Sequence, residues 1–299
     1  MKTPETVRHH PWTILKLLNW AASYFLSHDI DSPKSTAEIL LAHELHLKRI
    51  DLYLQYDRPL NERELAVFKQ LIQRRREREP VAYIVGSKEF WSIPLALTPD
   101  VLIPRPDTER LVEVALGLLI PAAGQSPLHV LDLGTGSGAI VLSLASQQPE
   151  HIYYASDISP HATALAKSNA LENGLGNIHF FAGDWLAPLR ISQALFDLIV
   201  SNPPYIPSGD IPHLQPEICR YEPLRALDAG PDGLACHRHL IEHAWTYLRP
   251  GGHLVMEMGY DQESDVTALA AACGCYEAIA AHKDYSGHDR VVSMRRRND

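Results

Sequence analysis

The sequence predicts an α/β protein in which a mostly parallel sheet follows a small helical domain. From Leu128 onward, apolar runs of strand length alternate with segments of helical periodicity, and such alternation produces a parallel sheet with helices on both faces. The first 80 residues carry only helical periodicity. The last two β-like stretches, 276–284 and 289–296, are not separated by a helix, which predicts an antiparallel pair.

Three helices are expected in the N-terminal region. Their segments, 11–28, 32–47 and 61–79, place apolar residues at helical spacing. Asn61 is expected to cap the third helix, and Pro80 ends it because proline lacks the N–H that a helix interior needs. We interpret residues 1–80 as a helical bundle that is either a stability module or, as we expect, a platform for a partner.

A β-hairpin is expected to link this bundle to the rest of the chain. Residues 81–106 alternate β-like residues around Gly86-Ser87-Lys88. The third domain, 107–299, then begins with a helix that Asp107 or Thr108 can cap.

The remaining elements of this domain follow in alternation. Strands are predicted at 128–134, 152–158, 177–184, 196–202 and 253–259. Helices are predicted at 138–148, 159–174, 235–248 and 262–274. Ligands of such sheets bind beyond the carboxyl ends of the strands, so the residues at those ends are the candidate functional residues.

Composition limits the classes of function. The hydrophobic share of 45% and the charged share of 21% are ordinary for a soluble globular protein. The formal net charge of −9 argues against stable binding of nucleic acid. Four cysteines are too few for a disulfide framework and lack zinc spacing, so no metal is expected. No apolar run reaches the length of a membrane span. We expect a cytoplasmic, monomeric protein that does not bind membranes.

A glycine-rich turn follows the first strand of the α/β domain. In "VLDLGTGSGAI", residues 130–140, the strand runs into three glycines and a helix follows. Glycines allow a tight turn and a close approach to a ligand, and the helix N-terminus adds free N–H groups. Asp157 ends the next strand, where a carboxylate can accept both hydroxyls of a ribose. The expected cofactor-binding residues here are Gly134, Thr135, Gly136, Ser137, Gly138 and Asp157.

Two classes of cofactor are compatible with this turn. The stretch satisfies the Gly-x-Gly-x-x-Ala pattern of dinucleotide-binding proteins. However, Asp132, two residues before Gly134, suits a cofactor with a cationic amino-acid end better than a pyrophosphate. Asp184 and Trp185 close the third strand, where an acid and an indole can meet the edge and face of an adenine. These features favour S-adenosylmethionine over a nicotinamide or flavin dinucleotide.

The fourth strand ends in Asn202-Pro203-Pro204-Tyr205. A planar amide or aryl amine is a poor nucleophile, because its lone pair is delocalised. A site can help by accepting both N–H bonds, and the Asn202 side chain and the Pro203 carbonyl offer two neutral acceptors. Pro204 stiffens the backbone, and Tyr205 offers a flat face for stacking. We therefore expect these four residues to form a catalytic pocket for methyl transfer to a planar nitrogen.

The motifs together resemble those of a known family. "DLGTGSGAI" with "NPPYI" is similar to class I S-adenosylmethionine-dependent methyltransferases that modify planar nitrogens. "PVAYIVGSKEFW", "LIPRPDTE" and "YEPLRALDAGPDGL" resemble the HemK/PrmC family of peptide chain release factor glutamine methyltransferases. The resemblance implies a Rossmann-like, mostly parallel sheet with a C-terminal antiparallel strand. It also implies transfer to the glutamine side-chain amide of a Gly-Gly-Gln motif in release factors.

The resemblance also implies roles for single residues. The glycine loop, Asp157 and Trp185 would hold the cofactor, Asn202 would touch cofactor and substrate, and Asp184 would contact the adenine. Arg105 and Glu222 would lie at the rim of the pocket or form a surface ion pair.

Three rival functions follow from the same residues. One is methylation of an exocyclic amine in a nucleic acid, and another is methylation of a glutamine in a ribosomal protein. The third is a scaffold that binds the cofactor without catalysis.

Overall fold

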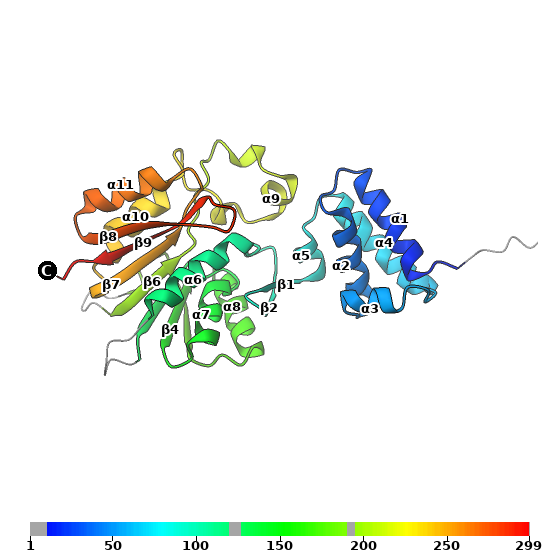
Figure 1. The fold of residues 1–299 in the computed structure, drawn as a ribbon, viewed down its shortest axis with the longest axis horizontal. Helices are drawn as coiled ribbons and strands as arrows, with labels where there is room; N and C mark the ends of the chain where they lie inside the picture. Colours follow the sequence, from blue (N-terminus) through cyan, green and yellow to red (C-terminus); the bar gives the residue numbers. More distant parts are fainter. Residues whose placement is uncertain (1–10, 120–126, 190–194, 299) are drawn as a thin grey trace, which may run out of the picture. The chain divides into compact units, whose positions relative to one another are not determined.

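The computed structural model describes residues 11–119, 127–189 and 195–298. The chain divides into two compact units, Met1–Gly86 and Ser87–Asp299. Each unit has its own hydrophobic core. Figure 1 labels most elements of both units.

The first unit is helical, as the sequence predicts. Its helices are α1 (Ile14–Leu26), α2 (Pro33–Leu45), α3 (Arg49–Leu54), α4 (Glu62–Arg76) and α5 (Val81–Val85). Asn61 caps α4 as expected, because its side chain accepts from the Glu64 N–H at 2.9 Å while the Glu64 carboxylate accepts from the Asn61 N–H. Phe25 and Phe68 lie in the core of this unit. The two short helices, α3 and α5, were not predicted.

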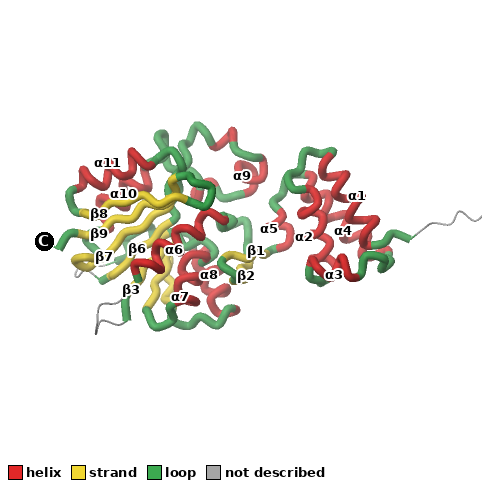
Figure 2. Tube along the Cα trace, viewed as in Figure 1, coloured by secondary structure: helices red, strands yellow, loops and turns green. Residues whose placement is uncertain are grey.

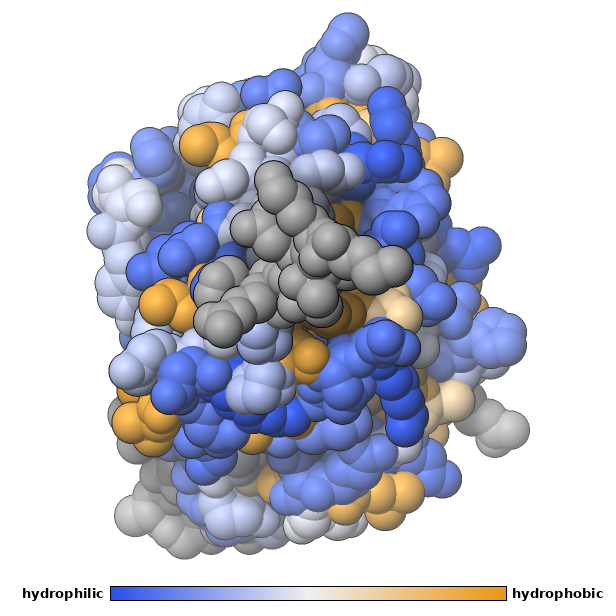
Figure 3. All heavy atoms as spheres, turned by 90° about the vertical axis from the view of Figure 1, so that its right-hand side faces the viewer, coloured by the Kyte–Doolittle hydropathy of each residue, from blue (hydrophilic) through white to orange (hydrophobic). Residues whose placement is uncertain are grey.

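Several large apolar side chains of the helical unit are exposed. Leu26 and Leu54 are 67% and 73% exposed, and Trp20 and Ile50 are also exposed. On the face shown in Figure 3, hydrophobic residues form separate groups among hydrophilic ones. None of the helices in the described part of the chain has the length and apolarity that a membrane span requires.

The linking hairpin is present, but its turn lies elsewhere than predicted. Strands β1 (Ser87–Phe90) and β2 (Ile93–Ala96) are antiparallel and connected by Trp91 and Ser92. Both residues have positive φ, 52° and 59°, as a two-residue hairpin turn requires. The expected turn at Gly86 is wrong, because Gly86 ends helix α5 with a φ of 73°. The apolar residues before Gly86 form helix α5. A short apolar run is compatible with either a strand or a helix.

The second unit is built on a seven-stranded sheet within the described residues. Its order is β5-β4-β3-β6-β7-β9-β8. The strands are β3 (His129–Leu133), β4 (Ile152–Asp157), β5 (Ile178–Ala182), β6 (Phe196–Ser201), β7 (Leu248–Glu257), β8 (Tyr276–Lys283) and β9 (Asp289–Arg296). The first five in this order pair in parallel, whereas β9 pairs antiparallel with β7 and β8. The predicted mixed sheet is therefore confirmed.

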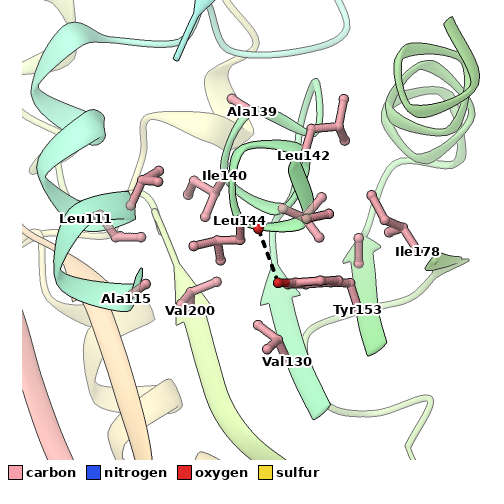
Figure 4. Close-up of a cluster of buried hydrophobic side chains, with 14 of the residues drawn as sticks. Leu111, Ala115, Val130, Ala139, Ile140, Leu142, Leu144, Tyr153, Ile178 and Val200 are labelled. Atoms are coloured by element: carbon pink, nitrogen blue, oxygen red, sulfur yellow. Dashed lines mark hydrogen bonds between the residues drawn. The ribbon is translucent and has the colours of Figure 1, made fainter. Parts of the chain in front are cut away.

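Helices cover both faces of this sheet (Figure 2). They are α6 (Glu109–Leu118), α7 (Ala139–Gln147), α8 (Pro160–Glu172), α10 (Ala235–Ala244) and α11 (Glu263–Cys273). The short helix α9 (Pro216–Tyr221) lies in the connection between β6 and α10. One core lies under α6 and α7, and a second lies under α10 and α11. Figure 4 shows part of the first core, where the buried Tyr153 hydroxyl donates to the Leu144 carbonyl at 3.2 Å.

The strand register brings four chain segments to one edge of the sheet. Leu133 of β3 pairs with Ser156 of β4 and with Ser201 of β6, and Ser201 pairs with Met256 of β7. The residue after each of these is therefore at the same carboxyl edge. Those residues are Gly134, Asp157, Asn202 and Glu257.

Candidate active site

The glycine loop turns tightly at the end of β3. Gly134, Gly136 and Gly138 all have positive φ, from 56° to 88°. A Cβ on Gly138 would lie 2.7 Å from the side chain of Leu142 in the first turns of helix α7. Only glycine therefore lets this side chain pack against the loop. A Cβ on Gly136 would meet nothing within 4 Å, because this glycine faces open space. The loop thus forms a cradle that side chains would fill.

Asp132 supports the loop from below rather than facing a ligand. Its side chain is fully buried, and its Oδ2 accepts from the Thr135 hydroxyl at 2.7 Å. Burial raises its pKa to about 7, while hydrogen bonds from Thr135 and the Val141 backbone act in the opposite direction. It is not among the residues that line the cavity above the loop. The expectation that Asp132 faces the cationic end of a cofactor is therefore corrected.

Asp157 is held rigidly at the end of β4. Its Oδ2 accepts from the Gly136 N–H and its Oδ1 accepts from the Ser159 N–H, both at 2.9 Å. A carboxylate oxygen has two lone-pair sites, so each oxygen keeps acceptor capacity toward the cavity. The same two hydrogen bonds join the glycine loop to the start of helix α8.

A cavity opens above these strand ends, entirely within the second unit. It is lined by Asp100, Val101, Leu102, Pro104, Thr108, Gly134, Thr135, Gly136, Ser137, Ala139, Ile140, Asp157, Ile158, Ser159, Trp185, Asn202, Pro204, Pro223, Arg225 and Ala226. Eight residues singled out from the sequence are among them: Gly134, Thr135, Gly136, Ser137, Asp157, Trp185, Asn202 and Pro204. The glycine loop and the Asn-Pro-Pro-Tyr segment therefore share one cavity.

Four residues expected at the site do not line this cavity. Gly138 directly precedes helix α7, and Pro203 is buried. Asp184 is exposed to solvent. Tyr205 is held from behind, since its hydroxyl donates to Glu257 Oε1 at 3.2 Å and its carbonyl accepts from the Gln262 side chain at 2.9 Å. The expected stacking surface on Tyr205 is thus not part of the cavity wall.

Asn202 lies on the cavity wall with a defined amide orientation. Its Nδ2 donates to the hydroxyl of Thr108 at 3.2 Å. The carbonyl oxygen is therefore the amide atom directed away from Thr108. Thr108 stands at the N-terminus of helix α6 but makes no capping hydrogen bond, which corrects the prediction that it caps this helix through its side chain. The sequence signal for Thr108 was its place in "PRPDTE".

A partly buried ion pair joins two walls of the cavity. The Arg105 guanidinium donates to Glu222 Oε1 at 2.5 Å, and the Ile103 N–H donates to Glu222 Oε2 at 3.2 Å. The Glu222 side chain is only 1% exposed. The segments on either side of this pair contribute Pro104 and Pro223 to the lining. Arg105 and Glu222 thus form an ion pair, one of the two roles considered, and neither residue lines the cavity itself. A role at the rim stays a prediction.

The arrangement fits S-adenosylmethionine. The open face of Gly136 leaves room for a ligand against the loop, and the fixed Asp157 carboxylate supplies acceptors for a ribose. Trp185 closes the same side, with its ring 3.8 Å from the position of a Cβ on Gly134. Ile158, which follows Asp157, also lines the cavity and is 51% exposed. Sequence reasoning missed it; its only signal was its place directly after the acid at the strand end.

The second unit therefore has the fold of a class I S-adenosylmethionine-dependent methyltransferase. Profiles of two families match the chain, one described as the PrmC N-terminal domain at residues 16–86 and one as a methyltransferase domain at residues 125–295. Because it is 43% identical over 284 residues to a curated release factor glutamine methyltransferase, the chain belongs to that family.

Curated relatives carry the family assignment. The chain is 43% identical over 284 residues to the release factor glutamine methyltransferase of Geobacter sulfurreducens, an alignment that covers 95% of this chain and 97% of the relative. It is 42% identical over 262 residues to that of Escherichia coli K12, with 88% and 92% covered.

Solved structures show the same fold at lower identity. A T. thermophilus 16S rRNA methyltransferase in complex with AdoMet and guanosine has a TM-score of 0.51 and 21% identity, and the match covers 71% of this chain and 50% of that one. The hMettl16 catalytic domain in complex with a MAT2A 3'UTR hairpin has a TM-score of 0.53 and 14% identity, over 70% and 77%. At these identities the likeness concerns the fold alone.

Proposed function

We propose that this chain transfers a methyl group from S-adenosylmethionine to the side-chain amide nitrogen of the glutamine in the Gly-Gly-Gln motif of peptide chain release factors. The observation that carries the proposal is the position of Asn202. It lines the same cavity as the glycine loop, and its NH2 group is already bound to Thr108. The free side of its amide is therefore an acceptor, which suits a substrate that presents an NH2 group.

The cofactor side of the cavity binds and orients. The Asp157 carboxylate would accept from the ribose hydroxyls, the backbone of Gly134 and Gly136 would approach the ligand closely, and Trp185 would cover the adenine. When bound, the cofactor supplies a methyl carbon activated by an adjacent sulfonium. The residues Gly138 and Asp184, which lie outside the cavity wall, would support this site indirectly.

The substrate side of the cavity would hold the nitrogen in line with that carbon. Asn202 Oδ1 and the Pro203 carbonyl would accept the two N–H bonds of the glutamine amide, and Pro204 would keep the backbone stiff. Transfer of the methyl group would leave a positive charge on the glutamine nitrogen, next to these two acceptors. Neutral acceptors bind the developing cation more strongly than the ground state, which lowers the barrier. The cationic product is acidic and releases its proton to water.

The test is methylation of a purified release factor. The chain is incubated with S-adenosylmethionine and release factor, and the Gly-Gly-Gln peptide is analysed by mass spectrometry. One added methyl group on the glutamine is expected, and none on a release factor whose glutamine is replaced by asparagine. Ribosomal proteins and RNA serve as competing acceptors. Methylation of either one, with an unmodified release factor, would refute the proposal.

The helical domain, 1–80, would contact the release factor during this reaction. Its exposed apolar side chains, such as Leu26 and Leu54, support this role because exposed apolar surface favours protein contacts. The enzyme would act as a monomer in the cytoplasm, where release factors work. Light scattering on the purified protein, with a mass of one chain of 33.4 kDa expected, tests the monomer.

A further inference from the structure

A buried glutamine joins three points of the chain at the carboxyl edge of the sheet. Gln262 directly precedes helix α11 and is 7% exposed. Its Oε1 accepts from the Gly259 N–H at 2.9 Å. Its Nε2 donates to the Tyr205 carbonyl at 2.9 Å and to the Gly233 carbonyl at 3.2 Å. The side chain therefore connects the loop after β7 to the Asn-Pro-Pro-Tyr segment and to the loop before α10.

The orientation of the Gln262 amide is set by backbone groups. A backbone N–H can only donate, and a backbone carbonyl can only accept. Gly259 therefore requires the amide oxygen, whereas the carbonyls of Tyr205 and Gly233 require the NH2 group, which has two protons to donate. A flipped amide would place donor against donor and oxygen against oxygen. All three hydrogen bonds thus depend on one orientation of the amide.

The close approach of these groups depends on a glycine. Gly233 has a φ of 73°, and a Cβ there would lie 2.8 Å from the Tyr205 carbonyl oxygen and 2.9 Å from Gln262 Nε2. Any other residue would therefore push the Gln262 amide away from Tyr205. This contact gives a physical reason for the glycine in "AGPDGL", residues 229–234, a stretch that the cavity itself does not explain.

The bond to Tyr205 holds the downstream end of the Asn-Pro-Pro-Tyr segment. The upstream end continues strand β6, whose last residue, Ser201, is paired with a strand on each side. Between these ends, Pro203 and Pro204 have no N–H, so neither can anchor the segment by donating a hydrogen bond. Beyond the strand, the Tyr205 carbonyl is the group that the Gln262 amide binds.

We propose that Gln262 is a positioning residue that holds the Asn-Pro-Pro-Tyr backbone in place for methyl transfer. This inference rests on the proposed function and deepens it. Asn202 and Pro204 line the cavity, and the Pro203 carbonyl is one of the two expected acceptors for the substrate nitrogen. A misplacement of about 1 Å can lower a rate on the order of 100-fold. Gln262 is not among the residues that line the cavity, so it acts through Tyr205.

The test replaces Gln262 by glutamate and by methionine in the full chain. Gln262→Glu keeps the shape and the acceptor for Gly259, but a carboxylate cannot donate to the two carbonyls. Gln262→Met keeps the length without polar groups or charge. Both variants should lower kcat on release factor on the order of 10- to 100-fold, because buried carbonyls lose their donor and the segment shifts. The Kd for S-adenosylmethionine should stay within about threefold.

The matched control is Asn177→Asp. Asn177 Nδ2 also donates to two backbone carbonyls, those of Pro149 and His151, each at 3.1 Å. It directly precedes strand β5, at the edge of the sheet opposite the cavity. The substitution removes the same two donations and adds the same charge, so it should lower the free energy of unfolding without changing kcat. A wild-type kcat in both Gln262 variants, or an equal loss in Asn177→Asp, would overturn the inference. A loss in Gln262→Glu alone would also overturn it, because the cause would then be the introduced charge.

A second readout does not depend on turnover. The Ile206 N–H, next to Tyr205, donates to the Leu227 carbonyl at 3.1 Å. In hydrogen-exchange mass spectrometry, the peptide that contains Ile206 should exchange faster in both Gln262 variants and at the wild-type rate in Asn177→Asp. Unchanged exchange in the Gln262 variants would contradict the inference even if the wild type methylates release factor. Faster exchange in these variants, with no methylation by the wild type, would instead support the restraint on the segment while refuting the proposed function.

Discussion

Gly136→Ala separates the backbone role of a glycine from its role as an open face of the cofactor site. Gly136 has a φ of 56°, and a Cβ there meets no protein atom within 4 Å. An alanine in this left-handed conformation costs about 1–2 kcal/mol of folding free energy. Its methyl group would occupy space in the cavity. Accommodating such an overlap costs about 1–3 kcal/mol, which would weaken binding of S-adenosylmethionine roughly 5- to 150-fold.

Gly174→Ala is the matched control. Gly174 has a φ of 71° with no atom within 4 Å of a Cβ, lies in the same unit and does not line the cavity. Both variants should lower the free energy of unfolding by a similar amount in urea titrations. Only Gly136→Ala should raise the Kd for S-adenosylmethionine in calorimetry. Equal affinities of the two variants would refute the reasoning that the open face of Gly136 belongs to the cofactor.

Three further predictions concern carboxyl and amide groups. Asn202→Ala should lower kcat on the order of 10²- to 10⁴-fold with the cofactor Kd little changed; near wild-type turnover in a methylation assay would remove Asn202 from the mechanism. Asp157→Ala should mainly weaken cofactor binding, and an unchanged calorimetric titration would contradict its role. Asp132 has a pKa raised from 3.8 to about 7. The folded state therefore binds this proton more tightly than the unfolded state, and the associated stability is present below pH 3.8 and lost as the pH rises to about 7. The loss is on the order of 1.4 kcal/mol per pH unit. Asp132→Asn should flatten that decline in a melting series from pH 4 to pH 8, whereas parallel curves for the two proteins would rule out Asp132 as its source.

The candidate site was only partly readable from the sequence. Gly134, Gly136 and Asp157 were found because they follow apolar strands, and strand ends of a parallel sheet meet at one edge. Thr108 and Glu257 gave no comparable signal. The first looked like a helix cap and the second like one more residue in an apolar strand. Their hydrogen bonds to Asn202 and Tyr205 depend on long-range packing that no local pattern encodes.

Sequence alone determined the seven strands of the sheet and the longer helices, the glycine loop and the Asn-Pro-Pro-Tyr segment at the end of β6. Each depends on local periodicity or on the backbone chemistry of glycine and proline. Tertiary structure decided three other features. They are the hairpin turn at Trp91 and Ser92, the burial of Asp132 beneath the glycine loop, and the absence of Tyr205 from the cavity lining. For Tyr205, the neighbours that bind its polar atoms are Glu257 and Gln262, which come from distant parts of the chain, so no local pattern could predict its direction.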